Sequence, residues 1–492
     1  MTAAPRPDGR ERESMRRSKE TLSRRILVGP LGFEIMRFGV PLALGMGLQT
    51  AFNLVDAYLI GQLDPEVAGP ALGAIGICDQ LAALGTIIAY GLTIATGALL
   101  SRSSGRGDGD AVRRVAWQSM LLVFALSSVF GLGGVFGARW LLADLVGAKG
   151  KVAELGEDYL AVMMGGSFTI FFLLHLASVA RSLGSSKTPV ALLVLANVLN
   201  LVLAALFVYG PGPAPPLFSW APPIASALGI PRLELLGAAW ATLVARGIAL
   251  VPMVVLLARR FGLFSRSALA LPDMAVLRQL VALGWPSSAQ LVVRILAMLL
   301  VHALVARLFT TDADQTATTA LGIVFRLETM ALFVALGWGS AAQTFVGQNL
   351  GAANLLRAKR SGWLTALYTA GTMAVLALVY RAFGASLVGF FDSDPDVIEV
   401  ALQYFSWVGA SYVALGVGIA LGSAIQGAGA TLQALWLDAA VVLLFQLPAS
   451  LLVAITPGAG MTSLWQVVAL TYCAFALVCA WSYHRGHFLR TK

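Results

Sequence analysis

Apolar runs of twenty or more residues recur along almost the whole of this 492-residue chain. Hydrophobic residues make up 58% of the sequence and charged residues only 12%, against roughly 25% charge in a typical soluble domain. Each run is long enough to cross a bilayer as a helix, and the runs lack the alternation of transmembrane β-strands. The sequence therefore predicts an all-α polytopic membrane protein.

We expect twelve membrane spans, with ends placed to within about 2–4 residues. They cover residues 34–62, 70–100, 115–138, 157–182, 188–210, 235–258, 277–308, 316–346, 361–386, 400–426, 432–455 and 464–483. Lys and Arg gather in the tails and loops on the side of the N-terminus, so the positive-inside rule places both termini in the cytoplasm. The basic N-terminal tail has no apolar core of a signal peptide, and we expect it to be disordered.

The two halves of the chain carry an internal repeat. Four identities recur 245 residues apart at equivalent places in the hydropathy pattern: Gly39 and Gly284, Pro41 and Pro286, Tyr159 and Tyr404, and Gly184 and Gly429. Six spans in each half give both halves the same orientation in the membrane. We therefore expect two six-helix bundles related by a pseudo-two-fold axis along the membrane normal, with a central cavity between them.

This repeat divides the chain into five predicted segments. A disordered basic tail, the N-lobe, an inter-lobe linker, the C-lobe and a cytoplasmic C-terminal tail are expected over residues 1–30, 31–258, 259–276, 277–483 and 484–492, respectively.

Asp56 lies inside an otherwise apolar span, where a carboxylate is costly and by default marks a function. Gln49 and Asn53 precede it at helical spacing and share its face. The other polar residues of the first half are Asp79, Asn197 and Asn200. This set is typical of a site for a proton or a small cation, although a carboxylate that only hydrogen-bonds a neighbouring helix is the structural alternative.

The second half carries a different set of charges inside its spans: Arg294, Arg326, Glu328 and Asp438. Arg326 and Glu328 are two residues apart and cannot face each other on an ideal helix. Each is expected to pair across helices, for example Arg294 with Glu328 or with Asp438. A structural ion pair is one interpretation, and a gate or a substrate cavity is the other.

Pro41 and Pro286 fall in predicted helix interiors, where proline removes a hydrogen bond and kinks the helix. A hinge at Pro41 would move the helix that carries Asp56. A passive kink fits the same pattern.

Several function classes are disfavoured by what the sequence contains. The cysteines (Cys78, Cys473 and Cys479) and the four histidines are scattered, so no metal site or other cofactor is expected. The basic tail lacks the interleaved aromatic residues that stack on nucleic-acid bases, and there is no GxxxxGK[ST] nucleotide-binding loop. Asp392, Asp394 and Asp396 form the one outer acidic cluster, and we interpret it as a helix cap rather than a catalytic group. An enzyme is therefore not expected.

Four stretches resemble the multidrug and toxic compound extrusion transporters. They are NLVDAYLIGQL after Pro41, VARSLGSSKTPVALLVLANVLN over 179–200, LLGAAWAT over 235–242 and TFVGQNLGAANLLRAKR over 344–360. The resemblance implies export of organic, often cationic compounds in exchange for H⁺ or Na⁺. It places the family's cation-coupling carboxylate on Asp56, with Asn53, Asn197 and Asn200 beside it. It also implies a monomer in a bacterial inner membrane.

The sequence also departs from that family. NorM-like members have a Glu where this chain has Arg294, and an Asp in the tenth span, where residues 411–427 contain none. Ala204 and Ser185 replace two further acidic positions. The chain therefore resembles the DinF-like branch more closely, with coupling through Asp56 and with H⁺ favoured over Na⁺. A lipid-linked oligosaccharide flippase and a multispanning enzyme are the alternatives.

Overall fold

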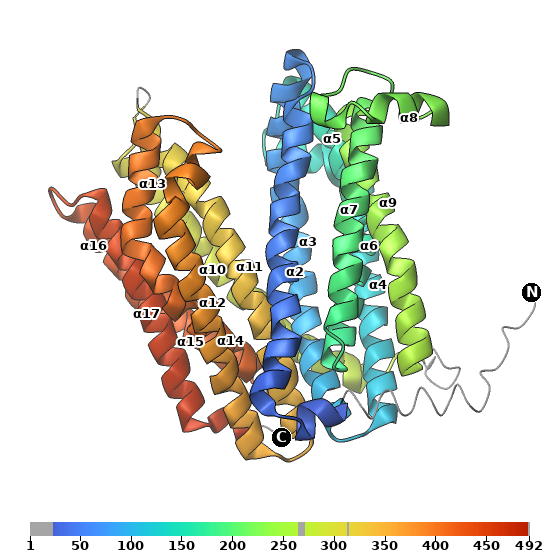
Figure 1. Cartoon of the computed structure of the whole chain (residues 1–492), viewed down its shortest axis with the longest axis vertical. Helices are drawn as coiled ribbons and strands as arrows, with labels where there is room; N and C mark the ends of the chain where they lie inside the picture. Colours follow the sequence, from blue (N-terminus) through green and yellow to red (C-terminus); the bar gives the residue numbers. More distant parts are fainter. Residues whose placement is uncertain (1–22, 264–270, 312–313, 491–492) are drawn as a thin grey trace, which may run out of the picture.

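The computed structural model describes residues 23–263, 271–311 and 314–490, and the side chains of residues 50–57, 65 and 490 lie outside that description. The described chain forms two helical bundles, the N-lobe and the C-lobe (Figure 1). The N-lobe contains α2 (Leu31–Gly61), α3 (Pro65–Gly105), α4 (Gly109–Arg139), α5 (Gly150–Gly165), α6 (Ser167–Ser182), α7 (Lys187–Tyr209), α8 (Ala221–Leu228) and α9 (Glu234–Leu256). The C-lobe contains α10 (Met274–Leu308), α11 (Thr316–Gly351), α12 (Leu355–Gly389), α13 (Pro395–Val408), α14 (Tyr412–Gly427), α15 (Thr431–Val441), α16 (Leu447–Ile455) and α17 (Met461–Arg485).

The expected membrane spans are confirmed. Among the described residues, eleven helical segments are long and apolar enough to cross a membrane, and α5 with α6 forms a twelfth that is bent by 41°. The bend coincides with Gly165 and Gly166, because adjacent glycines weaken a helix. A side chain at Gly166 would also collide with α9, since its Cβ would lie 2.1 Å from Leu243 Cδ2. The sequence predicts one span over 157–182, and the two glycines explain why this span is broken.

Helical structure extends beyond the first and last predicted spans among the described residues. Residues 23–28 are helical, although the disordered tail was expected to reach residue 30. Ile26 explains the difference, because it is buried in a cluster with Phe38 and Trp338. At the other end, α17 continues to Arg485 and Phe488 is buried. Met274 already belongs to α10, and part of the expected linker, residues 264–270, lies outside the described residues.

Glycines let the two lobes approach closely along four helices. Gly91 on α3 faces α10, where a Cβ would lie 2.4 Å from the carbonyl oxygen of Gly284. The equivalent crossing joins α11 to α2, where a Cβ on Gly337 would lie 2.6 Å from the Cα of Ala43. Small residues allow such backbone contact between membrane helices. The same glycine-based crossing therefore occurs once on each side of the pseudo-two-fold axis.

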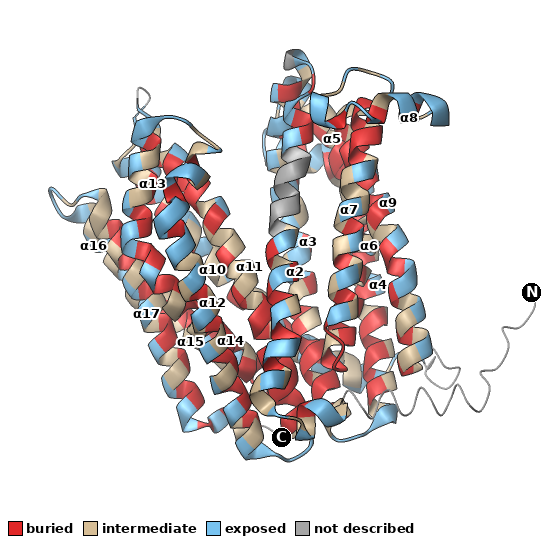
Figure 2. Cartoon of the chain, viewed as in Figure 1, coloured by how far each residue is buried: buried red, intermediate tan, exposed pale blue. Residues whose placement is uncertain are grey.

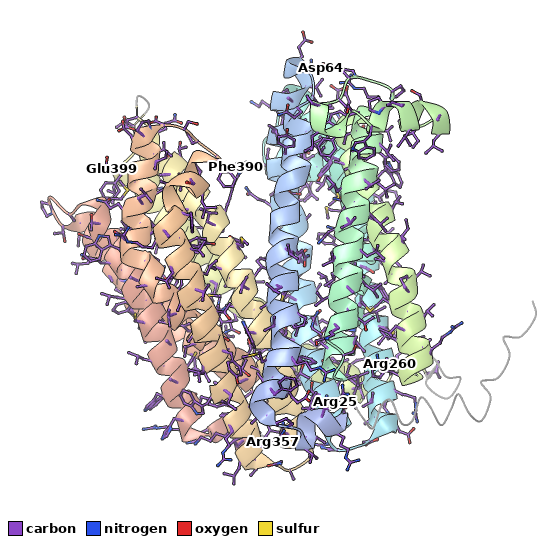
Figure 3. All side chains as sticks on the ribbon, viewed as in Figure 1. Arg25, Asp64, Arg260, Arg357, Phe390 and Glu399 are labelled. Carbon is purple, nitrogen blue, oxygen red and sulfur yellow. The ribbon has the colours of Figure 1, made fainter. Side chains whose placement is uncertain are left out.

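The two ends of the molecule differ. We call the end that carries the described chain termini the terminal end; Arg25, Arg260 and Arg357 lie there, and Asp64 and Glu399 lie toward the opposite end (Figure 3). The helices of the two lobes meet near the terminal end and diverge toward the opposite end (Figure 1).

The outer surface of the helices is apolar and unpacked by protein. On α9 the exposed side chains Trp240, Val244, Ile248 and Val251 follow one another at helical spacing, and so share one face. Exposed and buried faces alternate in the same way on the other long helices (Figure 2). A continuous apolar exterior is the expected surface of a protein in contact with lipid.

The acidic cluster caps a helix, as predicted. Asp394 precedes α13, and its side chain accepts a hydrogen bond of 2.9 Å from the backbone N–H of Asp396. Asp394→Ala should lower the free energy of unfolding by about 1 kcal/mol, because that N–H loses its partner. Unfolding in detergent measures the change, with the neighbouring Ser393→Ala as a control expected to stay within about 0.5 kcal/mol. Equal effects of the two substitutions would contradict the capping assignment.

Candidate substrate and ion site

Most of the polar set predicted for the N-lobe lies on α2 and α7, two helices that pack against each other. The side chains of Asn53 and Asp56 lie outside the described residues; their place on α2, one turn apart, is given by the helix itself. On α7, the side-chain oxygen of Asn200 accepts a hydrogen bond of 3.0 Å from Thr242 Oγ1 on α9. Asn197 is half-buried one turn earlier, and Gln49 on α2 is also half-buried. The role of this set in cation coupling remains a prediction.

Asp79 lies on α3, within the N-lobe, and its side chain is exposed. The positive charge of Arg246 on α9 acts on this carboxylate. Asp79 is therefore a carboxylate at the edge of the N-lobe with a basic residue in electrostatic range. This position fits a structural role at least as well as direct coupling.

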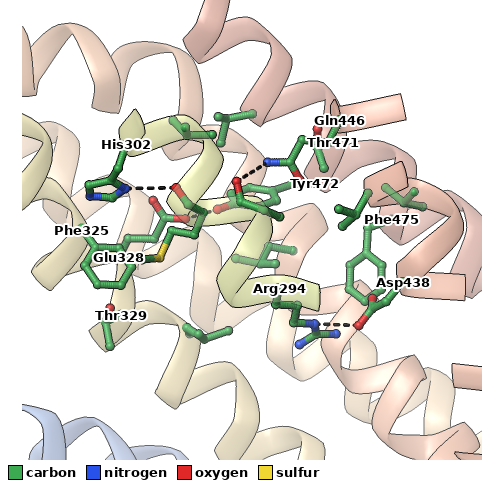
Figure 4. Close-up of a pocket in the computed structure, with 18 of the residues that line it drawn as sticks. Arg294, His302, Phe325, Glu328, Thr329, Asp438, Gln446, Thr471, Tyr472 and Phe475 are labelled. Carbon is green, nitrogen blue, oxygen red and sulfur yellow. Dashed lines mark hydrogen bonds and ion pairs between the residues drawn. The ribbon is translucent and has the colours of Figure 1, made fainter. Parts of the chain in front are cut away.

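The C-lobe encloses a pocket of about 150 Å³. Its walls come from α10, α11, α13, α14, α15 and α17 and from a π-helical turn, η5 (Val442–Gln446), between α15 and α16. Polar lining groups are Arg294, His302, Glu328, Thr329, Tyr404, Asp438, Gln446, Thr471 and Tyr472, and the aromatic and apolar lining includes Phe325, Phe475 and Met298 (Figure 4). A mostly apolar pocket with a few convergent polar groups is the usual form of a small-molecule site.

Glu328 is the acidic centre of one part of this pocket. Tyr404 on α13 donates a hydrogen bond of 2.5 Å to one carboxylate oxygen, and Tyr472 on α17 donates to the other. No Lys, Arg or His forms an ion pair with Glu328 within the part of the chain that the structure describes. Charge-assisted bonds from two hydroxyl groups stabilise a carboxylate but leave its charge unneutralised. The site can therefore take a proton or a cation.

Arg294 and Asp438 form a partly buried ion pair in another part of the pocket (Figure 4). Arg294 Nε on α10 lies 2.7 Å from Asp438 Oδ2 on α15, and the Asp438 side chain is only 4% exposed. The guanidinium group also lies 5.0 Å from the centre of the Phe475 ring. Of the two partners predicted for Arg294, the structure selects Asp438.

Among the described residues, Arg326 and Glu328 both contradict the expectation that each C-lobe charge pairs with an opposite charge across helices. The Arg326 side chain is exposed and lies over the ring of Phe391, with 6.0 Å between the guanidinium carbon and the ring centre. Arg326 and Glu328 point in different directions because they are two residues apart on α11. Arg326 therefore has an aromatic ring beside it, whereas Glu328 is bonded by the two tyrosines.

The structure adds site residues that the sequence pattern missed. Tyr404 stood out only as the repeat counterpart of Tyr159, and Tyr472, His302 and Gln446 did not stand out at all. Gln446 reaches the pocket because the η5 turn ends there, just before Pro448, which has no N–H to continue regular α-helical bonding. Such π-turns are frequent at functional sites. Thr329 Oγ1 is buried without a hydrogen-bond partner among the described residues.

The predicted hinge prolines occupy equivalent positions in the two lobes. Pro41 lies inside α2 and Pro286 inside α10, each two residues after a glycine of the repeat. Both therefore lie beside helix crossings that join the lobes. Their action as hinges remains a prediction.

The fold and the site define a two-lobed helical membrane protein with a mostly apolar pocket in one lobe. The MatE family model matches residues 41–206 and 286–452, and the chain therefore belongs to the MatE family. This confirms the family resemblance, and the two matched segments are the two halves of the repeat.

Individual relatives and structures agree with this assignment. The chain is 27% identical to the "Probable multidrug resistance protein YpnP" of Bacillus subtilis over 82% of this chain and 84% of that protein. It is also 27% identical to an "FAD transporter" of Shewanella oneidensis over 86% and 88%, respectively. Its fold matches a MOP superfamily transporter from Pyrococcus furiosus with a TM-score of 0.82, at 20% identity over 95% of this chain and 98% of that one. A MATE structure in the straight conformation also gives a TM-score of 0.82, at 20% identity over 95% and 99%. These proteins are transporters or drug-resistance proteins and not enzymes.

Proposed function

We propose that this protein is a secondary antiporter that exports organic, cationic or amphipathic compounds in exchange for inward H⁺ or Na⁺ by alternating access. The observation that carries the proposal is the C-lobe pocket, where Glu328 is held by two tyrosine hydroxyls inside an aromatic lining. A carboxylate and aromatic faces together attract an organic cation. The relatives, described as a multidrug resistance protein and an FAD transporter, support export of organic compounds and give no support to oligosaccharide flipping.

Each lobe offers a carboxylate for ion coupling, Asp56 on α2 and Glu328 on α11. A carboxylate inside the membrane can exchange protons as its surroundings change. A sodium site needs more oxygen ligands than one carboxylate and amides supply, so H⁺ is the proposed ion. The proposal places this chain nearer the DinF-like branch, because Arg294 is bonded to Asp438 and replaces an acidic group of the NorM-like members.

The distribution of charge supports an orientation. Arg25, Arg260 and Arg357 lie at the terminal end (Figure 3), and basic residues favour the cytoplasmic side. The terminal end is therefore the proposed cytoplasmic end of a monomer in a bacterial inner membrane. Because the lobes diverge toward the opposite end, the structure corresponds to an outward-facing state.

Glu328→Gln tests the proposed role of the pocket. The substitution keeps the size of the side chain and removes its charge, so ethidium export from cells should fall at least about tenfold, the effect of losing about 1.4 kcal/mol of interaction. Glu399→Gln is the matched control, because Glu399 is an exposed C-lobe carboxylate. Export is followed by ethidium fluorescence at equal amounts of membrane-inserted protein. Equal export by the two variants would remove Glu328 from the transport site.

A further inference from the structure

Helices α3 and α11 cross at the terminal end through a stripe of small residues on each helix. On α3 the stripe is Gly97, Ser101 and Gly105, and on α11 it is Gly347 and Gly351, with Gln343 one turn before them. Residues four apart lie on one face of a helix. Each of these α3 residues has its counterpart 246 residues later on α11, so the crossing brings equivalent positions of the repeat together.

The two glycines at the end of the stripe pack reciprocally on backbone. A Cβ on Gly105 would lie 2.0 Å from the carbonyl oxygen of Gln348, and a Cβ on Gly351 would lie 2.1 Å from the carbonyl oxygen of Arg102. Arg102 and Gln348 are themselves repeat counterparts. Backbone atoms cannot rotate away as a flexible side chain can. A methyl group at either glycine therefore requires the two helices to move apart.

Hydrogen bonds across the crossing follow a similar two-fold pattern. Gln348 Nε2 donates to the carbonyl oxygen of Ser182, the last residue of α6, at 2.8 Å. Arg102 Nη1 donates to the carbonyl oxygen of Ala428, directly after α14, at 3.4 Å. Carbonyl groups at helix ends have no partner within their own helix. Each lobe therefore supplies a donor to a helix end of the other lobe.

A third bond lies deeper in the same interface, where Gln343 Nε2 donates to the carbonyl oxygen of Ile94 at 2.9 Å. Gln343 and Gln348 are both buried. The side-chain amides of Gln343 and Gln348 lose their carbonyl partners if the lobes separate, and only water can replace those partners. The crossing is closed here, and it can open and close again. Water can bond its donors and acceptors when it is open.

We propose that the α3–α11 crossing is the inner gate of the transporter, and that the close approach at Gly105 and Gly351 sets the balance between outward-facing and inward-facing states. This inference rests on the proposed transport function and on the proposed orientation of the terminal end. The gate is closed here, while the lobes diverge at the opposite end (Figure 1). Parting the crossing admits the cytoplasm to the space between the lobes.

Spin-label distances test the gate without requiring transport. One pair of labels is placed at Arg106→Cys and Ala352→Cys, exposed residues directly after Gly105 and Gly351. A second pair at Glu66→Cys and Gln315→Cys reports on the opposite ends of α3 and α11. The native cysteines are replaced by alanine, and the protein is held in nanodiscs. The wild-type background should give mainly a short distance for the first pair.

Gly105→Ala and Gly351→Ala should each increase, at least about fivefold, the fraction of molecules in which the first pair of labels is far apart. In the same molecules the second pair of labels should come closer together. Gly76→Ala on α3 and Gly322→Ala on α11 are matched controls, since a Cβ at either position meets nothing within 4 Å. Distances that change no more in Gly105→Ala and Gly351→Ala than in these controls would overturn the proposal.

A variant that does not fold is replaced by Gln348→Leu, which keeps the packing but removes the bond to Ser182. It should lengthen the first distance in the same direction, and an unchanged distance would count against the gate. The outcomes also separate the two proposals. If the crossing opens in these variants but the protein moves no ethidium, the gate proposal is supported and the proposed drug export is contradicted.

Discussion

Replacing Arg294 by leucine should lower the free energy of unfolding by about 3–5 kcal/mol, because it leaves Asp438 as an unpaired buried carboxylate. The Asp438 side chain is 4% exposed, and its partner Nε is 2.7 Å away. Arg294 is 25% exposed, so water reaches the arginine side of the pair more readily than the aspartate side. Most of the loss in stability should therefore come from the cost of keeping the unpaired Asp438 carboxylate buried. Chemical unfolding in detergent micelles measures the difference.

The double variant Arg294→Leu with Asp438→Leu should recover most of that loss, since removing both charges removes the desolvation cost as well. Arg113→Leu is the control, because Arg113 and Asp110 form an exposed pair, whose loss should cost at most about 1 kcal/mol. A double variant as unstable as the single one would show that arginine packing against Phe475, and not the charge pair, accounts for the effect.

Asp56→Asn should abolish gradient-driven export by purified protein in proteoliposomes, a loss of at least about a hundredfold, equivalent to about 2.8 kcal/mol. Asparagine matches the size of aspartate but cannot bind and release a proton. Exchange of labelled for unlabelled ethidium without a gradient should persist, because it needs no ion. Asp64→Asn is the control: Asp64 follows the same helix but is exposed and paired with Arg232. Full export by Asp56→Asn would shift coupling to Glu328 or Asp79.

The helices and the duplication could be predicted because they depend on local properties of the chain. Apolar length sets the spans, and the Gly39–Pro41 and Gly284–Pro286 pairs fall at equivalent positions in the two halves, where the structure places equivalent helix crossings. The break at Gly165 and Gly166 was missed, because hydropathy does not register a bend within an apolar run. The structure shows it as a bend of 41° between α5 and α6, where Gly166 packs against Leu243 of α9.

The partners within the site could not be predicted, because they depend on which helices are neighbours. Glu328 is bonded by tyrosines from α13 and α17, which lie far along the chain and give no periodic signal. Arg294 had two possible acidic partners in the sequence, and only the packing of α10 against α15 selects Asp438. Arg326 was expected to pair in the same way, but it lies over the ring of Phe391, a contact that the sequence does not indicate.

The most direct test of ion-coupled export is ethidium movement by the purified wild-type protein in proteoliposomes, under an imposed pH gradient or an imposed Na⁺ gradient at the same membrane potential. We expect the pH gradient to drive ethidium against its own concentration gradient. Protons should move in the opposite direction, in an amount proportional to the ethidium transported. Movement driven only by the Na⁺ gradient would support the antiporter but would make Na⁺, and not H⁺, the coupling ion. Ethidium that moves against its gradient under neither condition would contradict the proposed export of organic cations.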